Sequence, residues 1–176
     1  MWKIFISYAW AIGCWKSPIT NYISTKLWLP TFNTDSVLSE VCEDFLELNW
    51  EEAHKRVEER LNKIIKDWTS FIYDASIDRK WWVLKDILVK NKYQYFIISI
   101  DLNKETLLKF YNVKSYYESI KRIDDVYQNH QNFLKEFWDD VNLCINENNY
   151  KKRLDIVYKA VSQRIKELEV KKNSVS

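Results

Sequence analysis

Apolar runs without polar alternation mark the strands that this sequence predicts. The clearest are Thr69–Tyr73 and Tyr95–Ile100, and the segment between them, Lys80–Lys90, places its apolar residues at helical spacing. A strand, a crossover helix and a strand form a right-handed βαβ unit with parallel strands, and such strands are buried on both faces. Similar runs predict a strand at Trp2–Trp10 and a short one at Thr31–Asn33. The pattern predicts an α/β protein with a small parallel sheet.

The helices of the N-terminal half are predicted from periodicity and from capping residues. Ser17–Leu27 has Pro18 at its first position, where proline is well tolerated. A second helix begins near Asp35 or Ser36. A third runs over Asn49–Asp67, with Asn49 as N-cap and a glutamate three residues later.

Beyond Leu102 the pattern changes to helical periodicity, and we expect no further strand. The sequence therefore predicts an α/β domain over residues 1–102, a helical extension packed on it over residues 103–170, and a disordered tail over residues 171–176. Val157, Val161 and Ile165 form a stripe on the last helix. We expect this stripe to pack on other helices, because an exposed stripe of that length favours aggregation.

Composition narrows the class of protein. The 176 residues have a net charge of +2 with acids and bases interspersed, which does not indicate nucleic-acid binding. Three cysteines at irregular spacing suit neither a disulfide framework nor a zinc site, so we expect a reduced, cytoplasmic setting. No apolar run approaches the ~20 residues of a membrane span. The single glycine argues against a glycine-rich phosphate-binding loop. The nine Trp and eleven Tyr serve either packing or an aromatic interaction surface.

Four pieces, in this order, resemble the Toll/interleukin-receptor (TIR) domain and its bacterial relatives. The first is F-I-S-Y at Phe5–Tyr8, and the second is the Asn49–Asp67 helix leading into Phe71–Ser76. The third is Trp82–Ile87, similar to W-V-x-x-E-[IL], and the fourth is the strand Ile97–Ile100. The resemblance covers about residues 2–102 and implies a flavodoxin-like parallel sheet.

The resemblance also implies a function. TIR-like enzymes cleave or cyclise NAD at the nicotinamide–ribose bond, with NAD as substrate and no resident cofactor, in antiviral defence signalling. The family's catalytic glutamate falls on Asp86, which is one methylene shorter. Trp82 or Tyr8 would stack on a ring of the substrate. The alternative is a TIR-like interaction module without catalysis, which would bind a protein partner or another copy of the chain through its aromatic or helical surface.

Physical reasoning points to the same region. Ligands of open parallel sheets bind beyond the carboxyl ends of the strands. If the first and third strands are adjacent, Ser7, Tyr8, Asp74 and Ser76 gather there, and Asp86 overhangs them from the following helix. The ordinary alternatives are that Asp86 is a solvated surface acid and that the serines are turn residues.

Three shorter patterns have simple explanations. Glu51–His54 forms an E-x-x-H, but a second copy is missing, so helix capping explains it. Asp78–Lys80 has the D-x-K form of a nuclease strand but falls in a predicted loop. Arg122 and His130 lie too far apart in sequence to place both groups reliably on one phosphate.

Overall fold

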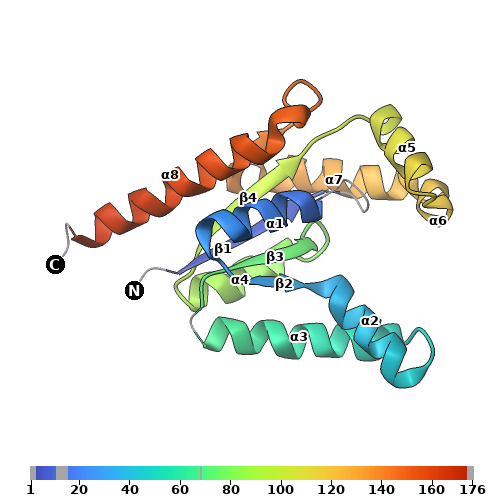
Figure 1. Ribbon diagram of the computed structural model, residues 1–176, viewed down its shortest axis with the longest axis horizontal. Coiled ribbons are helices and arrows are strands. Elements are labelled where there is room, and N and C mark those ends of the chain that lie inside the picture. Colours follow the sequence, from blue (N-terminus) through green and yellow to red (C-terminus); the bar gives the residue numbers. More distant parts are fainter. Residues whose placement is uncertain (1–2, 11–15, 68, 174–176) are drawn as a thin grey trace.

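Strand β1 (Ile4–Ala9) lies at the centre of a parallel sheet in the computed structural model, which describes residues 3–10, 16–67 and 69–173. Among these residues five strands pair in the order β2-β3-β1-β4-β5, and every pair is parallel (Figure 1). The predicted small parallel α/β sheet is confirmed. The other strands are β2 (Thr31–Asn33), β3 (Phe71–Ser76), β4 (Gln94–Ile100) and β5 (Val141–Ile145).

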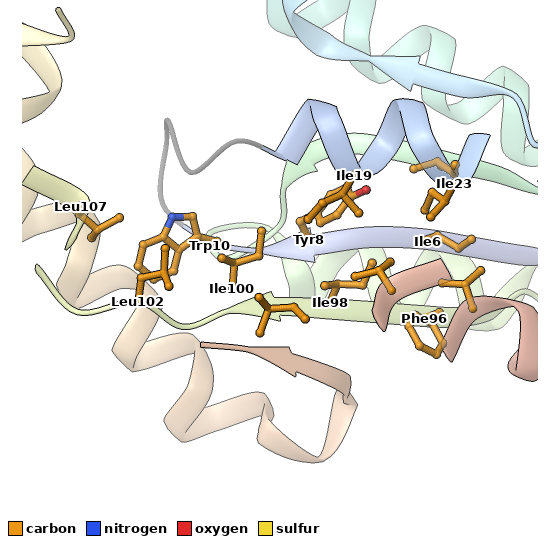
Figure 2. Packing of buried hydrophobic residues seen from close by; sticks show 14 of the residues in the cluster. Ile6, Tyr8, Trp10, Ile19, Ile23, Phe96, Ile98, Ile100, Leu102 and Leu107 are labelled. Atoms are coloured by element: carbon orange, nitrogen blue, oxygen red, sulfur yellow. The ribbon is translucent and has the colours of Figure 1, made fainter. Parts of the chain in front are cut away.

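Helices cover both faces of the sheet. On one face, helices α1 and α8 pack against β1 and β4, and Figure 2 shows Ile19 and Ile23 of α1 above Ile6 and Tyr8 of β1. On the other face, α3 and α4 cover the sheet around Phe5 and Phe71. The helices are α1 (Lys16–Leu27), α2 (Thr34–Phe45), α3 (Trp50–Lys66), α4 (Trp81–Lys90), α5 (Lys104–Val113), α6 (Tyr117–Lys121), α7 (Ile123–Phe137) and α8 (Arg153–Asn173), with short 3₁₀ turns η1 (Trp138–Asp140) and η2 (Tyr150–Lys152).

The predicted core is confirmed. The six apolar residues expected in one sheet are at most 1% exposed, namely Phe5, Ile6, Phe71, Ile72, Ile97 and Ile98. The two adjacent tryptophans on α4 face different sides of the helix, because successive helical residues point in different directions. Trp81 is fully buried, and Trp82 is exposed. On α8, Val157 and Val161 are buried in the cluster that also contains α1 and the sheet. The stripe on the last helix is therefore packed.

The expectation that no strand follows Leu102 is wrong. Strand β5 pairs in parallel with β4, so residues 103–170 contribute to the same sheet as residues 1–102. The register shifts between Ile97 and Ile98, and there the side-chain oxygen of Asn142 accepts a hydrogen bond from the Ile97 N–H at 2.8 Å. Helix α8 continues to Asn173, and the last three residues of the predicted tail lie outside the described residues.

A buried carboxylate connects η1 to α4 and β4. Asp140 accepts hydrogen bonds from Trp81 Nε1 at 2.8 Å, from Lys85 Nζ at 2.8 Å and from Tyr95 Oη at 2.7 Å. Burial alone would raise the pKa of Asp140, but the hydrogen bonds from Lys85, Tyr95 and Trp81 outweigh it and hold the pKa below its ordinary value. The carboxylate thus fixes the segment that enters β5.

Within the described residues, no helix is both long and apolar enough to cross a membrane.

The predicted N-cap of α3 is confirmed, because Asn49 Oδ1 accepts a hydrogen bond from the Glu52 N–H at 3.0 Å. Asn49→Ala should lower the free energy of unfolding by about 1 kcal/mol, the usual effect of losing a cap. Denaturant unfolding measures this loss. Asn49→Ser, which can still accept the bond, should restore most of it, and equal stabilities of the alanine and serine variants would contradict the capping role.

Candidate functional site

A cleft of about 610 Å³ opens at the carboxyl ends of β1 and β3. Its base is lined by Lys16 and Ser17 from the first turn of α1 and by Asp74 and Ser76 from the end of β3. One wall is formed by α2 and α3. The opposite wall includes Lys114 and other residues of the turn between α5 and α6, on the other side of the sheet end in Figure 1.

The first turn of α1 favours an anion. Helix α1 spans 12 residues and begins directly after the β1 connection, so its first backbone N–H groups have no intrahelical acceptor. The helix dipole adds positive potential at this end. Lys16 is half-buried and Ser17 is exposed, and both line the cleft. A cation, a hydroxyl and helical N–H groups together suit a phosphate group.

Asp74 supplies the negative charge at the base of the cleft. Its side chain is only 6% exposed, and its Oδ2 accepts a hydrogen bond from Asn33 Nδ2 at 3.3 Å. Its Oδ1 is buried and has no hydrogen-bond partner among the described residues. An ionised carboxylate oxygen in that position needs a cation or a donor. The site therefore fits Mg²⁺, which proteins hold through one or two carboxylates together with the phosphates of a substrate.

Ser7 and Tyr8 lie beneath the cleft instead of in it. The Ser7 hydroxyl is within hydrogen-bonding distance of the Tyr73 carbonyl at 3.0 Å and the Ala75 carbonyl at 3.2 Å, so it holds the end of β3 that presents Asp74. The Tyr8 hydroxyl bonds with Thr20 Oγ1 at 2.8 Å inside the core. Of the four strand-end residues predicted to gather here, Asp74 and Ser76 line the cleft and the other two support it.

The two predicted site residues on α4 lie elsewhere. Asp86 and Trp82 are exposed on that helix, and neither lines the cleft. Asp78 does line it, and its Oδ2 lies 3.0 Å from Nδ1 of His130, whose ring meets the edge of Trp10 at a centroid distance of 4.5 Å. Since His130 is fully buried, this pair anchors the turn after β3 beneath the cleft.

Sequence reasoning missed Lys16, Ser17 and Asp35 as cleft residues. A signal for the first two exists, because residues 10–17 read W-x-x-x-x-W-K-S, and the phosphate-binding loop motif is G-x-x-x-x-G-K-[ST]. Lys16 and Ser17 match its last two positions, while Trp10 and Trp15 replace its two glycines. The low glycine count therefore obscured a partial match to this motif.

Comparison with known proteins places this geometry in context. No protein-family model and no curated protein sequence matches the chain. Several solved structures match it over nearly the full length of both chains. The gluconokinase of Sinorhizobium meliloti has a TM-score of 0.67 at 6% identity and covers 97% of each chain. The APS kinase of Mycobacterium tuberculosis, solved with AMPPNP and APS, has a TM-score of 0.61 at 13% identity and covers 91% of this chain and 98% of its own. The shikimate kinase of Bacteroides thetaiotaomicron has a TM-score of 0.58 at 16% identity and covers 95% and 97%.

These matches overturn the TIR interpretation and with it NAD cleavage, the TIR-like interaction module and the role in antiviral signalling. The four matching pieces are apolar strands and amphipathic helices, which any parallel α/β protein contains. Strand order separates the two folds: a flavodoxin-like sheet has the order 2-1-3-4-5, whereas here β1 lies between β3 and β4. The catalytic role of Asp86 belonged to the discarded function and is not retained. The chain has the same overall fold as these three kinases.

Proposed function

We propose that the protein transfers the terminal phosphoryl group of a nucleoside triphosphate to a hydroxyl of a small molecule bound in the cleft. The observation that best supports this is the position of Lys16 and Ser17 at the start of α1, in the same cleft as Asp74, whose Oδ1 has no hydrogen-bond partner in the described part of the chain. A P-loop lysine that contacts the β- and γ-phosphates, a P-loop hydroxyl and a strand-end aspartate are the phosphate-handling groups of this fold.

Each residue has a definite role in this proposal. Lys16 and the N–H groups of α1 bind and orient the phosphates, and they stabilise charge on the transferred group. Ser17 and Asp74 would hold Mg²⁺, which neutralises charge on the phosphates when bound. Asn33 and Ser7 position Asp74 by the contacts described above.

Asp35 is the candidate general base. It lies in the first turn of α2, it is exposed, and it lines the same cleft as Lys16. Its carboxylate would accept the proton of the acceptor hydroxyl as the new O–P bond forms and the bond between the γ-phosphorus and the leaving diphosphate oxygen breaks. The products are a phosphate monoester and a nucleoside diphosphate.

The replaced glycines favour a second candidate, a nucleotide-binding protein that does not transfer phosphate. Glycine at these positions lets the backbone approach the phosphates closely. Trp10 at the first position is fully buried and packs on His130, so it is part of the core. Lys16 at the start of α1 can still contact a phosphate, so nucleotide binding does not require both glycines.

One pair of measurements separates these candidates. Calorimetric titration with AMPPNP and Mg²⁺ tests binding, and incubation with γ-³²P-labelled ATP and a panel of hydroxyl compounds tests transfer. Binding with transfer supports the kinase. Binding without transfer to any compound supports the second candidate, and the failure of AMPPNP, ATP and GTP to bind would reject both.

A further inference from the structure

The wall that α2 and α3 present to the cleft is aromatic and apolar. Trp50 and His54 lie one turn apart on α3, and their rings are 6.1 Å apart at an interplanar angle of 35°. Trp50 is 55% exposed although it lies beside a cavity. Leu38, Ala53 and Val57 complete this wall around the two rings. An exposed pair of rings flanked by aliphatic side chains is a surface suited to stacking with a planar molecule.

The two arginines of α3, Arg56 and Arg60, are directed into an ion network with acids of α2 and α3, and neither lines the cleft. Arg56 bonds with Glu52 at 2.9 Å and with Glu40 at 2.7 Å, and Arg60 bonds with Glu40 at 2.6 Å. The hydrogen bonds from Arg60 and Arg56 lower the pKa of Glu40 to about 2. Among the described residues that line the cleft, α2 and α3 contribute no lysine or arginine. The acidic residue that they contribute is Asp35. The cations that line the cleft come from α1, from the segment between β3 and α4, and from the end of α5, namely Lys16, Arg79, Lys80 and Lys114. The wall formed by α2 and α3 itself offers an anionic acceptor no matching charge among its described residues.

Asp35 indicates which reactant the wall receives. A carboxylate is useful beside a hydroxyl that must lose a proton, and it repels the phosphates of a donor nucleotide. Because Asp35 belongs to the same wall as Leu38, Trp50 and His54, the wall faces the acceptor and not the donor. This step rests on the proposed phosphoryl transfer.

We propose that the acceptor is an uncharged hydroxyl compound with a planar aromatic or heterocyclic ring, which stacks on Trp50 and His54 and places its hydroxyl near Asp35. The reaction is the phosphoryl transfer described above. The hydroxyl proton passes to Asp35, and the phosphoryl group passes to the hydroxyl oxygen. The class differs from acid acceptors such as gluconate or shikimate, whose carboxylates would find no cation among the described residues of this wall.

The test compares ring-bearing probes with aliphatic anions on matched variants. Adenosine, thymidine and pyridoxine represent the first class, and gluconate and shikimate the second. Binding is measured by calorimetry in the presence of AMPPNP and Mg²⁺ for the wild type and for Trp50→Ala, Trp50→Phe and Trp82→Ala. Trp82 is the control, because it is also an exposed tryptophan in the first turn of a helix but lies outside the cleft.

We expect at least one ring compound to bind more tightly than either anion. Trp50→Ala should weaken that binding roughly tenfold or more, the usual effect of removing a stacking ring, while Trp50→Phe largely retains it and Trp82→Ala does not change it. AMPPNP affinity should be equal in all four proteins, and His54→Ala should reproduce the effect if Trp50→Ala fails to fold.

Three results would overturn the proposal while leaving the nucleotide site intact. These are preference for the anions, ring binding that is unaffected by Trp50→Ala, and AMPPNP binding without binding of any ring compound. A loss of AMPPNP affinity in Trp50→Ala would assign the wall to the donor base and would also overturn it. Failure of the wild type to bind AMPPNP counts against the proposed function itself.

Discussion

Replacing Lys16 with alanine is expected to lower kcat/KM for phosphoryl transfer by about 10²–10³, the usual result of removing one preorganised group that stabilises developing charge. The proposal gives Lys16 this role because the residue lines the cleft from the first turn of α1, where the helix dipole already favours an anion. The melting temperature should change little, since Lys16 is only half-buried and lies at a helix start. Initial rates with labelled ATP measure the effect.

Lys26→Ala is the matched control. This lysine lies in the last turn of the same helix and does not line the cleft. We expect wild-type rates for it. Equal rates for the two alanine variants would show that Lys16 has no part in catalysis, and the site would have to be moved from the start of α1.

The second large effect is on stability. Asp140→Ala should lower the free energy of unfolding by about 3 kcal/mol, near the lower end of the range for breaking a buried ion pair because Lys85 remains partly exposed to water. The fully buried Trp81 would keep an N–H without its acceptor, which adds to the loss. Denaturant unfolding measures the difference, and a chain of this size should also melt roughly 6–12 °C lower. Asp139→Ala, at the exposed neighbouring position, should be nearly neutral.

The same carboxylate predicts a dependence on pH. The pKa of Asp140 is lower in the folded protein than its ordinary value of 3.8, so the unfolded chain binds more protons near that pH. Its contribution is fully present above pH 4 and is lost as the pH falls through the folded pKa. Asp140→Asn should flatten this part of the acid-unfolding curve. An unchanged slope would mean that the ion pair with Lys85 does not contribute to acid stability.

The parallel core could be predicted from sequence because its strands are continuous apolar runs, as at Phe71 and Ile97, which is the pattern of strands buried on both faces of a sheet. Strand β5 could not be predicted in this way. It is five residues long, it contains Asn142, and the helical repeat of Phe133 and Phe137 continues into Val141. Short apolar segments of this kind are ambiguous until a neighbouring strand supplies their hydrogen bonds.

The site was only partly predictable for a different reason. Asp74 and Ser76 follow from the rule that ligands bind beyond the carboxyl ends of parallel strands. Lys16 and Ser17 were obscured because glycine is the most recognisable feature of the phosphate-binding motif. Tryptophan replaces glycine at both of its positions in this sequence. The wall around Trp50 depends on how α2 and α3 fold over the sheet, and one-dimensional periodicity does not contain that information.

The central position of β1 also determines when the protein can fold during its synthesis. The strand is synthesised well before its partners, because it pairs Phe5 with Phe71 and Ile4 with Gln94, which lie far along the chain. Contacts so distant in sequence slow folding. Until β4 emerges, this mostly apolar strand has an unpaired edge, which makes the nascent chain a natural client for chaperones that shield such edges.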